Sequence, residues 1–137
     1  VNVREIALMG HEERKLGIVA GFCERLVHRS GFPTTIVPTT SVEEAAAGAR
    51  YVINHIRVGG MRARLRDEKL PPEHGMVGDD GVGGGGVANA MRTLPVVLDY
   101  ARRIEAVNPD ALFINLTNPM GIVMQALAQR TKLRCIG

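Results

Sequence analysis

Four arginines gather in one short stretch of this chain and are the first candidates for chemistry. They are Arg57, Arg62, Arg64 and Arg66. A guanidinium stays charged and presents forked N–H donors, which suit the oxygens of a phosphate or carboxylate. The cluster indicates either an anion-binding site or a solvated helix face whose charges pair with Asp67 and Glu68.

The composition narrows the kind of anion. The net charge is +3 and the pI is near 9.2, but only 4% of the residues are aromatic and none is tryptophan. Nucleic-acid binders usually combine a basic face with aromatic side chains that stack on bases. We therefore expect a small phosphorylated ligand and no nucleic acid.

A glycine run from Gly81 to Gly86 fits the pattern G-x-G-x-x-G of dinucleotide-binding loops. That loop must directly follow a hydrophobic strand, because the pyrophosphate lies between the strand end and the helix start. Here two prolines and the pair Asp79-Asp80 precede the glycines. We therefore predict a flexible loop over residues 71–86 that enters a helix at Val87.

Two cysteines, Cys23 and Cys135, are too few for a disulfide framework and form no zinc motif. No apolar run is long enough to span a membrane, and the N-terminal residues do not resemble a signal peptide. We expect a reducing, cytoplasmic location and no membrane association.

Hydrophobic periodicity predicts alternating strands and helices. Ser41, followed three residues later by Glu44, indicates a capping box that starts a short helix. Pro95 lies inside a long predicted helix and should kink it. Strands are expected at 3–9, 34–37, 51–56, 111–116 and 133–136, and further helices at 11–29, 87–107 and 121–129. This order predicts a doubly wound α/β fold with a parallel sheet, typical of Rossmann-like NAD-binding domains.

In such a fold the true phosphate loop would lie before Val1, and the strand at 3–9 would be the second of the unit. That strand ordinarily ends in an acid that holds the adenosine ribose. Met9-Gly10 stands there instead, and Glu12 or Glu13 could take its place.

Two long segments, with Asp79-Asp80 between them, resemble the NAD- and manganese-dependent glycosidases of glycoside hydrolase family 4. They are INHIRVGGMRARLRDEKLPPEHGMVG and GGVANAMRTLPVVLDYARRIEAVNPDALFINLTNPMGIV. The family includes 6-phospho-α- and 6-phospho-β-glucosidases, α-galactosidases and α-glucuronidases. The resemblance runs from Val3 to the last residue.

The resemblance implies an unusual way to cleave a glycosidic bond, without two carboxylates flanking that bond. NAD takes hydride from sugar C3, and a divalent metal, usually manganese, polarises the ketone. A tyrosine then removes the C2 proton, and the aglycone leaves by elimination. The ketone acidifies the neighbouring C–H bond, and the metal stabilises the enediolate.

The resemblance also assigns roles to residues of this chain. Arg64 matches the arginine that contacts the substrate near its phosphate, and Asn118 matches the asparagine that hydrogen-bonds the sugar. From the residues alone, an ordinary turn asparagine before proline would be the favoured interpretation of Asn118. Asp80 matches an acid that raises the basicity of the catalytic tyrosine. Asn54 and Arg57 match a segment near the cofactor and sugar.

The sequence departs from the family pattern at two places. Relatives have Gln before the acid and Gly-Pro-Gly-Gly after it, where this chain has Asp79 and the glycines at 83–86. Gly137 aligns with the glycine before the family's metal cysteine. That cysteine, the metal histidine and the tyrosine base would all lie further on, and Cys135 is expected to be a core thiol.

We therefore expect residues 1–137 to be a partial NAD-binding domain, truncated at both ends and inactive alone. It would lack the catalytic and metal domain and belong to a protein that forms a homo-oligomer when complete. Two alternatives stay open. One is a 2-hydroxy-acid dehydrogenase of the lactate and malate type, which the RVGG and RDE segments fit poorly, and the other is a degenerate, non-catalytic domain.

Overall fold

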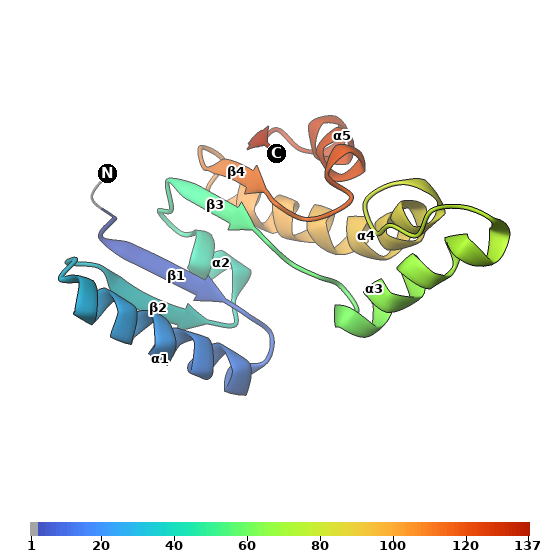
Figure 1. The fold of residues 1–137 in the computed structure, drawn as a ribbon. Helices are drawn as coiled ribbons and strands as arrows, with labels where there is room; N and C mark the ends of the chain where they lie inside the picture. Colours follow the sequence, from blue (N-terminus) through green and yellow to red (C-terminus); the bar gives the residue numbers. More distant parts are fainter. Residues whose placement is uncertain (1–2) are drawn as a thin grey trace. The chain divides into compact units, whose positions relative to one another are not determined.

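The computed structural model describes residues 3–137, which fall into two compact units. The first unit ends at Ala47 and the second begins at Gly48. Each contains a parallel sheet with helices packed against it (Figure 1). Parallel strands with intervening helices confirm the predicted α/β class.

The first unit pairs two strands in parallel. Strand β1 (Glu5–Met9) and strand β2 (Thr35–Thr39) run side by side, with Ile6 opposite Ile36. Helix α1 (Glu13–Ser30) connects them and packs mainly along β2 (Figure 1). It ends at Gly31, whose φ of 69° lies in the left-handed region that glycine adopts without strain.

The predicted cap at Ser41 is present at the start of helix α2 (Val42–Ala46). The Ser41 hydroxyl accepts a hydrogen bond from the Glu44 amide at 3.2 Å. The Glu44 carboxylate, however, accepts from the hydroxyl of Thr39 at 2.5 Å. The side chain of Glu44 thus ties the helix to the end of β2.

The second unit holds a three-stranded parallel sheet in the order β3-β4-β5. Its strands are β3 (Tyr51–Asn54), β4 (Leu112–Asn115) and β5 (Arg134–Ile136). Its helices are α3 (Gly60–Lys69), the 3-10 helix η1 (Pro71–His74), α4 (Gly83–Val107) and α5 (Met120–Arg130). Helices α3 and α5 both pack against α4 (Figure 1). The core consists of fully buried apolar side chains, among them Val97, Ala101, Phe113, Val123 and Leu127.

The predicted loop over 71–86 is wrong at both ends. Residues Pro71–His74 form η1, and helix α4 begins at Gly83 instead of Val87. A side chain at Gly85 would collide with the backbone carbonyls of Asp79 and Asp67, and one at Gly86 would lie 2.8 Å from the carbonyl carbon of Gly81. The glycines therefore let the first turn of α4 pack closely against the loop before it.

No strand directly precedes the glycine run, because residues 75–82 form neither helix nor strand, so the strand that a dinucleotide-binding loop must follow is missing there. Pro95 does lie inside α4. Among residues 3–137, no helix is both long and apolar enough to cross a membrane.

Candidate functional site

The site begins where strands β3 and β4 end. Asn54 and Asn115 are the last residues of these strands and lie opposite each other in the register. Both are buried, and Nδ2 of Asn54 donates to Oδ1 of Asn115 at 2.8 Å. The amide of Asn115 in turn donates to the backbone oxygen of Thr117 at 3.0 Å. This buried amide pair fixes the two segments that leave the sheet.

Thr117 joins the same two segments a step further on. Its buried hydroxyl accepts a hydrogen bond from the amide of Ile56 at 2.9 Å. That hydroxyl also lies 3.2 Å from the backbone oxygen of Ile56. The segments after β3 and β4 are therefore held side by side, at the carboxyl ends of parallel strands, where doubly wound sheets bind ligands.

A pocket of about 260 Å³ opens between these segments. This volume falls just below the roughly 300–1,000 Å³ of a typical ligand pocket, so it suits one ring of a larger ligand. Its lining residues are His55, Ile56, Arg57, Asn89, Leu116, Thr117 and Asn118.

Asp80 is the residue at which the predicted site residues meet. Its carboxylate is buried and pairs with Nη1 of Arg57 at 2.7 Å. Nε of Arg64 lies 3.8 Å away and Nδ2 of Asn118 lies 3.4 Å away. Four of the five predicted residues, drawn from four separate segments of the second unit, thus share one cluster.

The charge state of Asp80 follows from opposing effects. Burial by itself raises the pKa of its carboxyl group. The hydrogen bond from Arg57, the charge of Arg64 and the hydrogen bond from Asn118 outweigh burial and hold the pKa below its usual value. Asp80 is therefore ionised at neutral pH.

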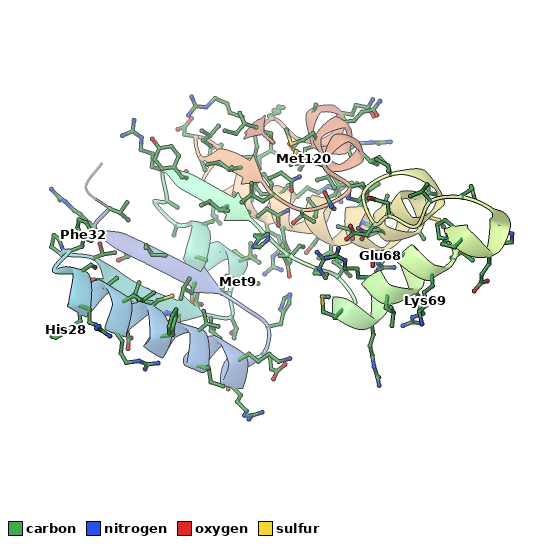
Figure 2. The ribbon with its side chains drawn as sticks, in the orientation of Figure 1. Met9, His28, Phe32, Glu68, Lys69 and Met120 are labelled. Carbon is green, nitrogen blue, oxygen red and sulfur yellow. The ribbon has the colours of Figure 1, made fainter. Side chains whose placement is uncertain are left out.

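Glu68, also on α3 (Figure 2), is a second acidic partner of Arg64. Nε of Arg64 donates to Oε1 of Glu68 at 2.6 Å, one helical turn away. This bond, followed by the charge of Asp80, raises the pKa of Arg64. Within residues 3–137, Nε makes the only hydrogen bond of this guanidinium, so its terminal nitrogens can face an oxyanion.

Asp79, the residue before Asp80, fixes the conformation of the loop that carries both. Oδ1 of Asp79 accepts hydrogen bonds from the amides of Gly81 at 2.5 Å and Val82 at 3.1 Å. A methyl group at Gly81 would lie 3.3 Å from Nδ2 of Asn118. The glycine therefore allows the loop to approach the Asn118 turn closely enough for the two side chains to bond.

The arginine cluster and its two expected acidic partners, Asp67 and Glu68, behave differently from one another. Arg64 reaches the site, and the predicted pairing with Glu68 is confirmed. Asp67 does not pair with the cluster. It is buried and binds Arg92 of α4, with Oδ2 at 2.5 Å from Nη2.

Asn89 and Arg92 were missed in the sequence, and Asp67 was assigned the wrong partner. The signal available was an acid in an arginine-rich helix and two polar residues on the apolar stripe of α4. Hydrophobic periodicity does not show that Asp67 contacts residues 22 or more positions further along the chain. Those contacts depend on how α3 packs against α4.

Asn54 does not line the pocket, and its amide binds Asn115. Arg57 does line it, as does Asn118. The cofactor role of Asn54 and Arg57 and the substrate role of Arg64 and Asn118 stay predictions.

The described residues do not fit a metal centre. No group of three or more His, Cys, Asp or Glu side chains gathers anywhere in residues 3–137. Both cysteines are free. Burial raises the pKa of the Cys135 thiol, which donates to the backbone oxygen of Leu133 at 3.4 Å. A thiol in that state is a poor metal ligand.

The fold and this cluster define a class that comparison with known proteins confirms. Residues 1–137 match the model of the family 4 glycosyl hydrolases, and the chain belongs to that family.

One curated relative and two solved structures illustrate the similarity. The chain is 37% identical over 134 residues to the probable 6-phospho-beta-glucosidase of Bacillus subtilis, covering 96% of this chain and 30% of that protein. The 6-phospho-beta-glucosidase of Thermotoga maritima, solved with manganese, NAD+ and glucose-6-phosphate, superposes with a TM-score of 0.89 at 30% identity. The match covers 100% of this chain and 32% of that one.

A 6-phospho-alpha-glucosidase from gut microorganisms, solved with NAD and glucose-6-phosphate, gives a TM-score of 0.89 at 28% identity. The alignment covers 99% of this chain and 31% of that one. The chain thus spans about 30% of the length of the relatives it matches.

Proposed function

We propose that the whole protein is an NAD- and manganese-dependent glycosidase acting on 6-phosphoglucosides, and that this chain supplies one wall of its substrate pocket. The observation that carries the proposal is the convergence of Arg57, Arg64 and Asn118 on Asp80 beside the pocket. Family membership and relatives solved with NAD, manganese and glucose-6-phosphate support it.

In this proposal the residues of the chain bind and orient the sugar. Arg64 offers its terminal N–H groups to the substrate phosphate, which a guanidinium fork matches. Asn118 is exposed and offers its amide to a sugar hydroxyl. When bound, NAD supplies a hydride acceptor for C3 and Mn²⁺ polarises the resulting ketone.

Asp80 acts through its negative charge. An ionised carboxylate stabilises a positive neighbour and raises the proton affinity of an acid beside it. It can therefore increase the basicity of a tyrosine that approaches the pocket. Neither tyrosine of this chain lines the pocket, so we expect that tyrosine, like the metal ligands, in another part of the whole protein.

NAD fits the site in one respect. The pocket lies at the carboxyl ends of β3 and β4, and its volume admits one ring, such as a nicotinamide or a sugar, but not a dinucleotide. Arg57 is the residue we expect nearest the cofactor.

Family membership favours this function over a 2-hydroxy-acid dehydrogenase. We further propose a cytoplasmic location, supported by the two free cysteines. Assembly as a homo-oligomer stays a prediction, to be measured by sedimentation of the full-length protein.

The test uses the full-length protein and p-nitrophenyl 6-phosphoglucosides of both linkages. We expect nitrophenol release that requires both NAD and Mn²⁺ and stops when either is removed. Turnover without NAD, or reduction of NAD by lactate or malate without glycoside cleavage, would contradict the proposal.

A further inference from the structure

One turn of α4 carries three polar side chains, of which Asn89 lines the pocket. Asn89, Arg92 and Thr93 lie three and four positions apart, so they share one face of the helix. Asn89 and Thr93 are buried, at 6% and 1% exposure. Polar groups this deep in a helix face are retained only with their hydrogen bonds satisfied.

Asn89 satisfies its amide with two backbone oxygens of the site. Nδ2 donates to the oxygen of Asp80 at 2.9 Å and to the oxygen of Asn118 at 3.2 Å. These residues lie 38 positions apart in the sequence, and each contributes a side chain to the cluster. One amide group therefore fixes the backbone beneath both side chains.

The orientation of this amide is set by its other atom. Oδ1 of Asn89 accepts from the hydroxyl of Thr93 at 2.8 Å and lies 3.4 Å from Nη2 of Arg92. A flipped amide would place its NH₂ against these two donors and its oxygen against two carbonyls. Only the observed orientation satisfies all four neighbours.

Arg92 fixes the backbone of the segment that carries Arg57. Its Nε donates to the backbone oxygen of Val58 at 2.9 Å, directly after Arg57. Gly59 follows, with φ of 80°, and a side chain there would lie 3.2 Å from Cδ of Arg92. Arg92 also binds Asp67 of α3, so the α4 turn contacts all four segments that carry the cluster.

We propose that Asn89 is a positioning residue for the glycosidase site, which sets the separation between the carboxylate of Asp80 and the amide of Asn118. The inference rests on the proposed function. Asn89 acts through the two backbone segments and takes no part in the reaction itself.

The decisive variant is Asn89→Asp, which keeps the shape and the acceptor toward Thr93 but removes both N–H donors. Its second oxygen would face the backbone oxygens of Asp80 and Asn118, and the loop and turn should separate. We expect kcat/KM for the phosphoglucoside to fall by about tenfold or more in the full-length protein.

Asn108→Asp is the matched control. Nδ2 of Asn108 also donates to a backbone oxygen, that of Ala49 at 2.8 Å, but at the opposite end of α4. Nineteen residues of helix separate the two asparagines, about 28 Å along the axis. This variant should lower the unfolding temperature and leave kcat/KM unchanged.

Amide hydrogen exchange tests the positioning without relying on turnover. Asn89→Asp should speed exchange at residues 79–82 and 117–121, and Asn108→Asp should not. If Asn89→Asp does not fold, Thr93→Val replaces it, because it removes only the donor that orients the amide. It should give the same local pattern and a decrease of about threefold in kcat/KM.

The possible outcomes distinguish the positioning role of Asn89 from the proposed glycosidase function. Unchanged exchange at both segments overturns the positioning role, whatever the wild type hydrolyses. Faster exchange with unchanged kcat/KM in an active enzyme overturns it as well, because position would not matter to the site. An inactive wild type with faster local exchange refutes the proposed function and leaves Asn89 as the support of these segments.

Discussion

Asp80 is buried and still ionised, so its neighbours must stabilise its charge. Two arginines and one amide contact a single carboxylate. Removing its charge would leave Arg57 and Arg64 without the negative charge that they share. Under the proposed function, the sugar contacts and the electric field at the pocket should therefore change together.

We predict that Asp80→Asn in the full-length protein lowers kcat/KM for a phosphoglucoside by about 100-fold. The amide keeps the shape of the carboxylate, so the loss reports charge. Asp79→Asn is the control, because its Oδ1 can still accept from Gly81 and Val82. Steady-state kinetics of the two variants measures the difference, and equal effects would assign it to the loop instead.

The lowered pKa of Asp80 also predicts a pH dependence of stability. A carboxyl group whose pKa is lower in the folded state stabilises the fold above its unfolded pKa of about 3.9. That stabilisation is lost as the pH falls through the folded value. Urea unfolding should show wild type more stable than Asp80→Asn at pH 7, with the gap narrowing as the pH is lowered below about 4. A gap that widens in acid would reverse the sign.

Several residues of the site could be predicted from the sequence, and others could not. Arg64, Asp80 and Asn118 were found through family segments, and the structure places them in contact. Asn89 has no such signal, because its role depends on two backbone oxygens that folding brings together. Side-chain type alone does not reveal which backbone a buried amide will bind.

At the scale of elements, the strands were predicted closely because continuous apolar runs mark buried parallel strands. The start of α4 was missed, since four glycines disfavour a helix by propensity. Close packing of Gly85 against the backbone of Asp67 and Asp79 overrides that propensity. Tertiary contacts of this kind are absent from local sequence patterns.

The α3–α4 contact depends on a buried ion pair, and this gives a stability prediction. Asp67 is 4% exposed and binds both terminal nitrogens of Arg92. Arg92→Met should lower the free energy of unfolding by about 3–5 kcal/mol, because it leaves a buried charge unpaired.

The control is Arg103→Met, also on α4, whose pairing with Asp99 at 3.6 Å is exposed. It should cost less than about 1 kcal/mol. Urea titration of the full-length protein compares the two variants. Equal losses would show that burial of the Asp67 pair contributes nothing special.

At the scale of the whole molecule, the chain spans about 30% of the length of its relatives. Its second unit provides the strand ends, the pocket and the Asp80 cluster. Side chains within residues 3–137 form no cluster that could hold a metal, and no tyrosine among them lines the pocket. Under the proposed function, this chain would contribute substrate contacts, and the metal ligands and the tyrosine would lie in another part of the whole protein.

We therefore predict that residues 1–137 alone are inactive. Mixed with NAD, Mn²⁺ and p-nitrophenyl 6-phosphoglucoside, they should release no nitrophenol, while the full-length protein does so under the same conditions. Turnover by the 137 residues would mean that they hold a metal site and a base of their own.

The most direct measurement is a crystal structure of the full-length protein with NAD, Mn²⁺ and glucose 6-phosphate. The sugar should lie in the pocket beside the Asp80 cluster, with a hydroxyl bonded to the amide of Asn118 and the phosphate bonded to Arg64. A sugar bound elsewhere, with Asn118 and Arg64 contacting only protein, would contradict the account.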